Sequence, residues 1–137
     1  MLSQLQLKQH SFTSIHLDTN ENGSVDAPIL ISTNIEGGED KENPYLLSVK
    51  LTVILESDAE HSCAYTGKVE IIGQFEVAEN FDITKRLDVM RVNAVSILYG
   101  AVREMVMTIT ARSANGMLCI PTLSFIDLPD NIEKIET

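Results

Sequence analysis

The sequence predicts an α+β fold: a four-stranded antiparallel sheet followed by one long helix and a short irregular C-terminal segment. Two observations predict this class. Segments in the first half of the chain alternate apolar and polar residues, which is the pattern of a strand that buries one face. Residues 92–112 contain no proline and carry apolar residues at helical spacing. Strands followed by a helix favour an antiparallel sheet with its helices on one face.

Length and composition are those of one globular domain. We expect a single domain over residues 1–137 with one hydrophobic core. Ten Lys and Arg against twenty Asp and Glu give a formal net charge of −10, which argues against binding to nucleic acid or to an anionic membrane surface. The acidity either serves solubility or favours a basic partner.

The expected location is the cytoplasm. Cys63 and Cys119 lie among apolar residues without CxxC spacing, so a reduced pair is the simplest interpretation. The N-terminus lacks the basic-then-apolar form of a signal peptide. No apolar run approaches the roughly 18 residues of a membrane span, so we expect no membrane insertion.

Four segments read as strands. Residues 5–17 alternate unevenly, which predicts a bulge with Phe12 on the face opposite Leu5 and Leu7. Residues 29–36 form a short strand, and 37–44 a polar loop that opens with two glycines. Residues 45–56 and 62–77 alternate clearly and predict an antiparallel hairpin with one face in water. The expected inward residues are Tyr45, Leu47, Val49, Leu51, Val53, Leu55, Cys63, Tyr65, Val69, Ile71, Phe75 and Val77.

Residues 18–28 resemble part of a calcium-binding EF-hand loop. Asp, Asn and Gly fall at several of the ligand positions, but the twelfth position is Ile29 where the motif needs a bidentate Glu. The flanking residues alternate like strands, whereas the motif needs helices. A turn rich in Asn, Asp and Gly is therefore the favoured interpretation, and no metal site is expected.

The helix of residues 92–112 is apolar over about half of its circumference, more than the stripe of about 100° that a surface helix needs. It therefore needs cover on two sides, and we expect a second subunit to provide one of them. Asn115-Gly116 should end the helix. The predicted oligomer-interface residues are Val95, Leu98, Tyr99, Val102, Met105, Val106 and Ile109.

The C-terminal segment is too apolar for a free tail and too broken by Pro121 and Pro129 for a long helix. Its surplus apolar residues are open to two interpretations. They are all core and subunit interface, or some of them line a groove for an apolar ligand or peptide. The two interpretations are compatible.

No combination of residues points to catalysis. His10, His16 and His61 lack metal-ligand spacing, no serine lies in a GxSxG turn, and neither cysteine has a histidine placed as its base by a motif. Acidic pairs such as Glu39-Asp40 lie in polar loops. We expect no enzyme activity, no catalytic residues and no cofactor.

Several motifs resemble the export chaperone SecB. The hairpin ends in Gly73-Gln74-Phe75, similar to a GxF motif in that family, and Asn93 to Glu104 echoes its helix opening NILFPYARE. Pro121 to Phe125 matches a PxxxF pattern. The resemblance covers roughly residues 7–128.

This resemblance implies an ATP-independent holdase, a homotetramer built as a dimer of dimers with its helices between the sheets. It implies long apolar grooves that bury segments of unfolded or nascent polypeptides and a role in protein export. The client-binding residues carried over to this sequence are Phe75, Met117, Leu118, Ile120, Leu123, Phe125 and Ile126.

Three departures from the family pattern bear on partners. Gly100 stands where the family has proline, and the second C-terminal helix is shortened. The acidic surface that binds the SecA motor is only partly matched, by Ser14, Asp18, Thr66 and Lys68, which puts coupling to SecA in doubt. The alternatives are a chaperone dedicated to an antitoxin, or a SecB-fold protein that only assembles or binds a small apolar ligand with its groove closed by its own C-terminal segment.

Overall fold

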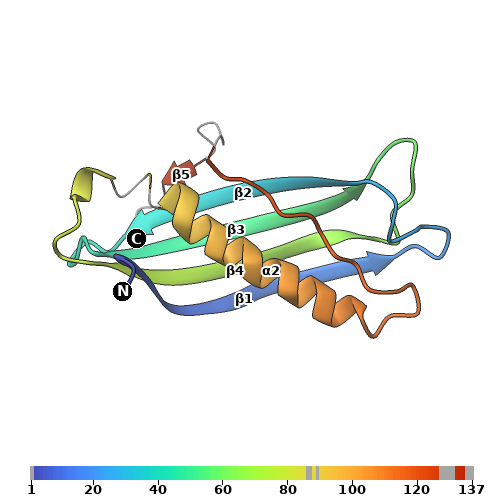
Figure 1. Cartoon of the computed structure of the whole chain (residues 1–137), viewed down its shortest axis with the longest axis horizontal. Helices are drawn as coiled ribbons and strands as arrows, with labels where there is room; N and C mark the ends of the chain where they lie inside the picture. The colour runs from blue at the N-terminus through green and yellow to red at the C-terminus, as the bar shows by residue number, and fades with distance from the viewer. Residues whose placement is uncertain (1, 86–87, 89, 127–131, 135–137) are drawn as a thin grey trace.

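The computed structural model describes residues 2–85, 88, 90–126 and 132–134. Its strands are β1 (Leu5–Thr19), β2 (Ile29–Glu39), β3 (Leu46–Ser57), β4 (Tyr65–Val77) and β5 (Ile132–Lys134), in the sheet order β1-β4-β3-β2-β5. The helix α2 (Val95–Thr110) crosses one face of this long, twisted sheet (Figure 1). The predicted fold class, a four-stranded antiparallel sheet followed by one long helix, is confirmed; the short β5 adds a parallel strand beside β2.

The β3–β4 hairpin follows the alternation of the sequence. Leu47 pairs with Phe75, Leu51 with Ile71 and Val53 with Val69, and all six side chains are buried under α2. The structure starts β3 at Leu46 and β4 at Tyr65, so the second strand is shorter than predicted. Cys63 lies just before β4, and its main chain forms an isolated parallel β-bridge with that of Ser24.

The edge strand β1 contains two register irregularities, between Leu7 and Gln9 and between Phe12 and Ser14. The predicted bulge is therefore present, but the predicted face of Phe12 was wrong. Phe12 pairs with Ile71 and Leu7 with Phe75, so both face α2. Each irregularity adds one residue to β1, which returns the next apolar side chain to the same face.

Strand β2 is three residues longer than predicted because Gly37 and Gly38 continue it as partners of Val49 and Ser48. The turn before β2 is confirmed as a turn built on polar residues. Asn20 accepts hydrogen bonds from the Gly23 and Asn22 amides, and the Ser24 hydroxyl accepts one from the Asp26 amide.

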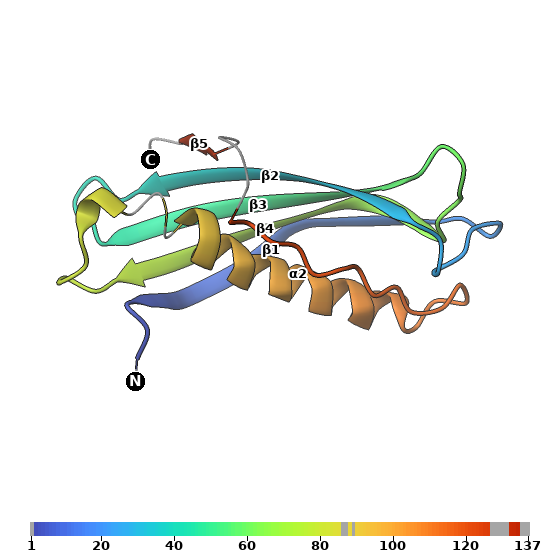
Figure 2. The ribbon, with the colours of Figure 1, turned by 45° about the horizontal axis from the view of Figure 1, so that its top comes forward.

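A π-helical turn, η2 (Met90–Ala94), leads into α2, and a 3₁₀ turn, η1 (Ile83–Lys85), precedes it. The helix ends at Thr110, earlier than predicted, and a turn carries the chain to Gly116, whose φ is 93°. Val92–Thr110 is long and apolar enough, by length and composition, to cross a membrane. A core helix passes the same test, and α2 lies flat against the sheet of its own chain (Figure 2).

The core lies between the sheet and α2. Val95, Leu98, Val102 and Val106 are fully buried on the inner side of the helix. Gly73 on β4 allows the close approach of the two layers, because a Cβ added there would lie 2.7 Å from Leu98 Cδ2.

Candidate functional site

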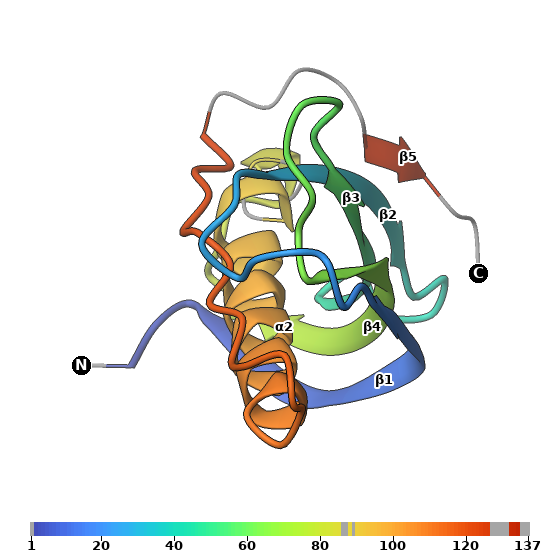
Figure 3. The same ribbon diagram turned by 90° about the vertical axis from the view of Figure 1, so that its right-hand side faces the viewer.

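The segment after α2, residues 116–126, is extended and lies beside α2 on the same face of the sheet (Figure 3). We call it the strap. It runs back along α2 toward the start of the helix, so that Pro121 lies beside Tyr99 in the N-terminal half of α2 (Figure 1). The strap therefore provides part of the second cover that the wide apolar arc of α2 requires.

Four side chains hold the strap by its main chain. Tyr99 Oη–H donates a hydrogen bond to the Pro121 carbonyl at 2.6 Å, and Arg103 Nε–H donates to the Ile120 carbonyl at 3.0 Å. Thr110 Oγ1 accepts from the Leu118 amide at 2.9 Å.

The fourth contact joins the strap to the sheet. The Tyr65 hydroxyl on β4 donates a hydrogen bond to the Gly116 carbonyl where the strap begins. The sequence analysis did not single out Tyr65, Arg103 or Thr110 for this role. The signal for Thr110 is that it is a polar residue in line with the apolar positions Val102 and Val106 of the helix.

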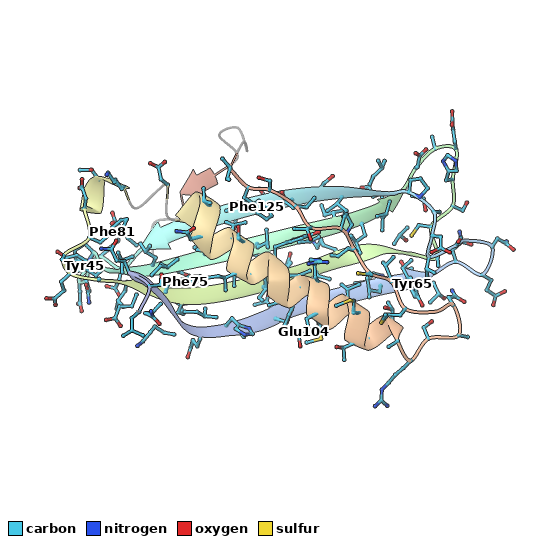
Figure 4. All side chains as sticks on the ribbon, viewed as in Figure 1. Tyr45, Tyr65, Phe75, Phe81, Glu104 and Phe125 are labelled. Atoms are coloured by element: carbon cyan, nitrogen blue, oxygen red, sulfur yellow. The ribbon has the colours of Figure 1, made fainter. Side chains whose placement is uncertain are left out.

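Apolar side chains of the strap alternate between core and solvent. Leu118, Ile120 and Phe125 are buried, whereas Met117 is 53% and Ile126 is 68% exposed. The Phe125 ring meets the Tyr99 ring edge to face, with ring centroids 5.5 Å apart. Such aromatic pairs stabilise a contact beyond the area they bury. Figure 4 shows Phe125 beside α2 and Tyr65 near the other end of the strap.

Burial of Tyr99 raises the pKa of its hydroxyl to about 12, an effect opposed by the nearby positive charge of Arg103. The hydroxyl is therefore a stable hydrogen-bond donor at neutral pH. Its bond to the Pro121 carbonyl persists over the physiological range.

The structure separates the predicted client-binding residues into two groups. Phe75, Leu118, Ile120 and Phe125 belong to the core of the protomer and are not available to a client in this conformation. Leu123 is half-buried, and Met117 and Ile126 are exposed. The client-binding role of all seven stays a prediction.

The interface role of the seven predicted oligomer-interface residues stays a prediction, and the structure shows how each of them lies within one protomer. Five of them pack inside the protomer, because the sheet and the strap cover the apolar arc from both sides: Val95, Leu98, Tyr99, Val102 and Val106. Met105 is half-buried and Ile109 is exposed, so these two remain at the surface. The outer flank of α2 instead presents Ile97, Gly100, Glu104 and Thr108.

The four positions aligned with the SecA-binding surface lie together on the outer face of β1 and β4, away from α2. Asp18 pairs with Thr66 across the two strands, and Ser14 and Lys68 lie on the same face. Lys68 Nζ is 3.3 Å from a Glu70 carboxylate oxygen, so its charge is partly compensated. The patch exists as a surface, with mixed charge.

Metal-binding clusters are absent from the described residues. No group of three or more His, Cys, Asp or Glu side chains gathers there in a way that could hold a metal ion.

The fold is SecB-like. A solved structure of the SecB-like chaperone Rv1957 from Mycobacterium tuberculosis, in complex with a ChAD peptide from the HigA1 antitoxin Rv1956, superposes with a TM-score of 0.68. The match covers 88% of each chain at 16% sequence identity, so it shows the fold alone. A protein of unknown function from Streptococcus agalactiae gives a TM-score of only 0.44 at 12% identity, over 88% of this chain and 97% of that one.

Sequence comparison identifies a relative. No known protein-family model matches the chain. The uncharacterized protein MJ0357 of Methanocaldococcus jannaschii is 30% identical over 106 residues, which are 77% of this chain and 67% of the relative. The chain therefore belongs to the same protein family as MJ0357.

Proposed function

We propose that this protein is an ATP-independent holdase, a chaperone that binds unfolded or nascent polypeptides through apolar surface. The observation that carries the proposal is the strap, an extended segment held on α2 by its main chain and by alternate apolar side chains. A surface that holds such a segment has the chemistry to hold a foreign one. The SecB-like fold, shared with a chaperone that binds an antitoxin peptide, supports the proposal.

Suppression of aggregation tests the holdase. We expect the protein, without nucleotide, to keep a heat-unfolded reporter enzyme in solution and to bind reduced, carboxymethylated α-lactalbumin, which is permanently unfolded. Native α-lactalbumin is the matched control and should not bind. Absence of both effects at several-fold molar excess over the client would refute the proposal.

A homotetramer, as a dimer of dimers, is the proposed assembly, and two surfaces support it. On the outer flank of α2, Ile97 is 41% exposed and a Cβ added at Gly100 would meet nothing within 4 Å. In the described part of the chain, β1 has a strand partner only on its β4 side, which leaves a long edge that favours pairing. Light scattering coupled to gel filtration measures the mass, and a monomer at micromolar concentration would contradict the assembly.

The client class has two candidates. An export chaperone would bind precursors and couple to SecA, whereas an antitoxin-dedicated chaperone would bind one partner. The mixed charge of the β1–β4 patch, where Lys68 lies beside Glu70 and pairs with His16 across the strands, supports the second over the first. A titration with purified SecA separates them, because binding of SecA with submicromolar affinity would favour export.

A further inference from the structure

We infer that the strap is an internal ligand: it occupies the surface that receives an extended apolar segment of a client, and a client binds by replacing it. This rests on the proposed holdase function and specifies where and how the client is held. The inference follows from how the strap is attached, what its side chains do, and what its departure would leave behind.

The attachment of the strap is independent of its sequence. Tyr99 and Arg103 donate to main-chain carbonyls, and Thr110 accepts from a main-chain amide. Every polypeptide carries these groups at the same spacing, so any extended segment that reaches the surface can use the same partners.

The side chains of the strap show which residues the surface selects. Leu118 and Ile120 point into the core and Cys119 between them is exposed, which is the alternation of an extended chain with one buried face. Phe125 fills the position beside Tyr99. A replacing segment therefore needs apolar residues at alternate positions and an aromatic or large aliphatic residue about five positions further on.

Departure of the strap breaks no strand pairing in the described part of the fold. In the described part of the chain, residues 117–126 make no hydrogen bond from main chain to main chain, so neither the sheet nor α2 depends on them for pairing. Departure exposes apolar side chains of α2 and the sheet, a state that is costly in water and is stabilised by an incoming apolar segment. The apparent affinity for a client is then set by the fraction of molecules in which the strap is displaced.

Two conservative substitutions test the inference. Leu118→Val and Ile120→Val each shorten a buried side chain of the strap and leave Tyr99, Arg103 and Thr110 unchanged, so they weaken the hold of the strap without weakening that of a client. We expect each to bind carboxymethylated α-lactalbumin on the order of fivefold more tightly than the wild type, because loss of one buried methyl or methylene group shifts strap release by about that factor. Ile54→Val is the matched control, because Ile54 lies on the face of β3 away from α2, and should match the wild type.

A second measurement follows the strap directly. Cys119 is exposed and Cys63 is buried, so an environment-sensitive dye attaches to the strap alone. Addition of the unfolded client should shift the emission of the dye in the wild type with the same midpoint as binding.

The outcomes separate the two proposals. No binding of the client by the wild type refutes the holdase and the strap replacement with it. Binding by the wild type with unchanged or weaker affinity in both folded variants, or binding without a dye signal, overturns the strap replacement and leaves the holdase standing. Circular dichroism establishes that each variant is folded.

Discussion

The contact between α2 and β4 at Gly73 provides a quantitative test of the packing. In Gly73→Ala, the new Cβ would lie 2.7 Å from Leu98 Cδ2 and 2.7 Å from Phe75 Cε2, closer than real Cβ contacts. Both neighbouring side chains are buried, so neither has free space to move into. Overpacking of this kind costs about 1–3 kcal/mol, and the reduced freedom of the unfolded chain offsets about 0.4–1 kcal/mol of it. We expect a net loss of about 1–2 kcal/mol in the free energy of unfolding.

Gly100→Ala is the matched control, because the chemical change is identical and the surroundings are opposite. A Cβ at position 100 meets nothing within 4 Å, and Gly100 lies inside α2. Alanine is better than glycine in a helix interior by about 0.8–1.0 kcal/mol. The same substitution should therefore stabilise at position 100 and destabilise at position 73.

A third variant assigns the cost at position 73 to its neighbour. Leu98→Val removes the Cδ atoms that the new methyl group would contact. The double mutant Gly73→Ala/Leu98→Val should then lose less stability than the sum of the two single mutants, by at least about 0.5 kcal/mol. A purely additive result would mean that Leu98 is not the obstacle.

Urea unfolding monitored by far-UV circular dichroism measures these differences, at one protein concentration because assembly contributes to stability. An unchanged or raised stability of Gly73→Ala would refute the close packing of α2 on β4. A loss of stability in Gly100→Ala that is largest at high protein concentration and shrinks on dilution would mean instead that the outer flank of α2 lies in a subunit interface.

Three further predictions follow from single positions. Burial raises the pKa of Tyr99 to about 12, so the protonated hydroxyl stabilises the folded state. This stabilisation, on the order of 2–3 kcal/mol in total, is complete below pH 10 and is lost as the pH rises through 12. Urea unfolding across this range should show a smaller loss of stability with rising pH in Tyr99→Phe than in the wild type. In Gly67→Ala the new Cβ would lie 1.9 Å from the His16 carbonyl oxygen, so β1 must move away from β4 locally. The free energy of unfolding should fall by about 2–3 kcal/mol, and the β1 amides near His16 should exchange their hydrogens faster. Ile120→Ala should lower the free energy of unfolding by about 2–5 kcal/mol, because Ile120 is 0% exposed. Ile126→Ala should lower it by less than about 0.5 kcal/mol, because Ile126 is 68% exposed. Equal urea midpoints for the two variants would contradict the packing of the strap.

The strands were predictable where one face is buried and pairing is regular. β3 alternates without interruption because every second residue, from Leu47 to Leu55, faces α2. β1 was harder to predict, because each of its two bulges adds one residue and reverses which alternate positions face α2. Simple alternation therefore placed Phe12 on the wrong face. The extension of β2 through Gly37 and Gly38 was missed because strand pairing uses main-chain groups, which the two glycines have without a pattern of side chains.

The apolar residues of the strap were predictable from the sequence, but the way they pack was not. Leu118, Ile120 and Phe125 stood out as surplus apolar residues, but whether they face a groove, a second subunit or their own core depends on the path of the chain after Gly116. That path is set by contacts distant in sequence, from Tyr65 on β4 and Tyr99 and Arg103 on α2. A polar side chain that binds a main-chain carbonyl leaves no periodic signal in a sequence.

The strap also changes what a second subunit must cover. From the sequence, a second subunit was expected to cover one of the two apolar sides of α2, whereas within the protomer the sheet covers Val102 and Val106 and the strap covers Tyr99. The exposed large apolar residues of α2 are Ile97 near its start and Ile109 near its end, with Met105 half-buried between them. Release of the strap would enlarge the exposed apolar surface of α2, because the helix face that it covers becomes exposed. On the proposed mechanism, client binding and subunit assembly would use adjacent parts of α2, so addition of an unfolded client should change the affinity between subunits.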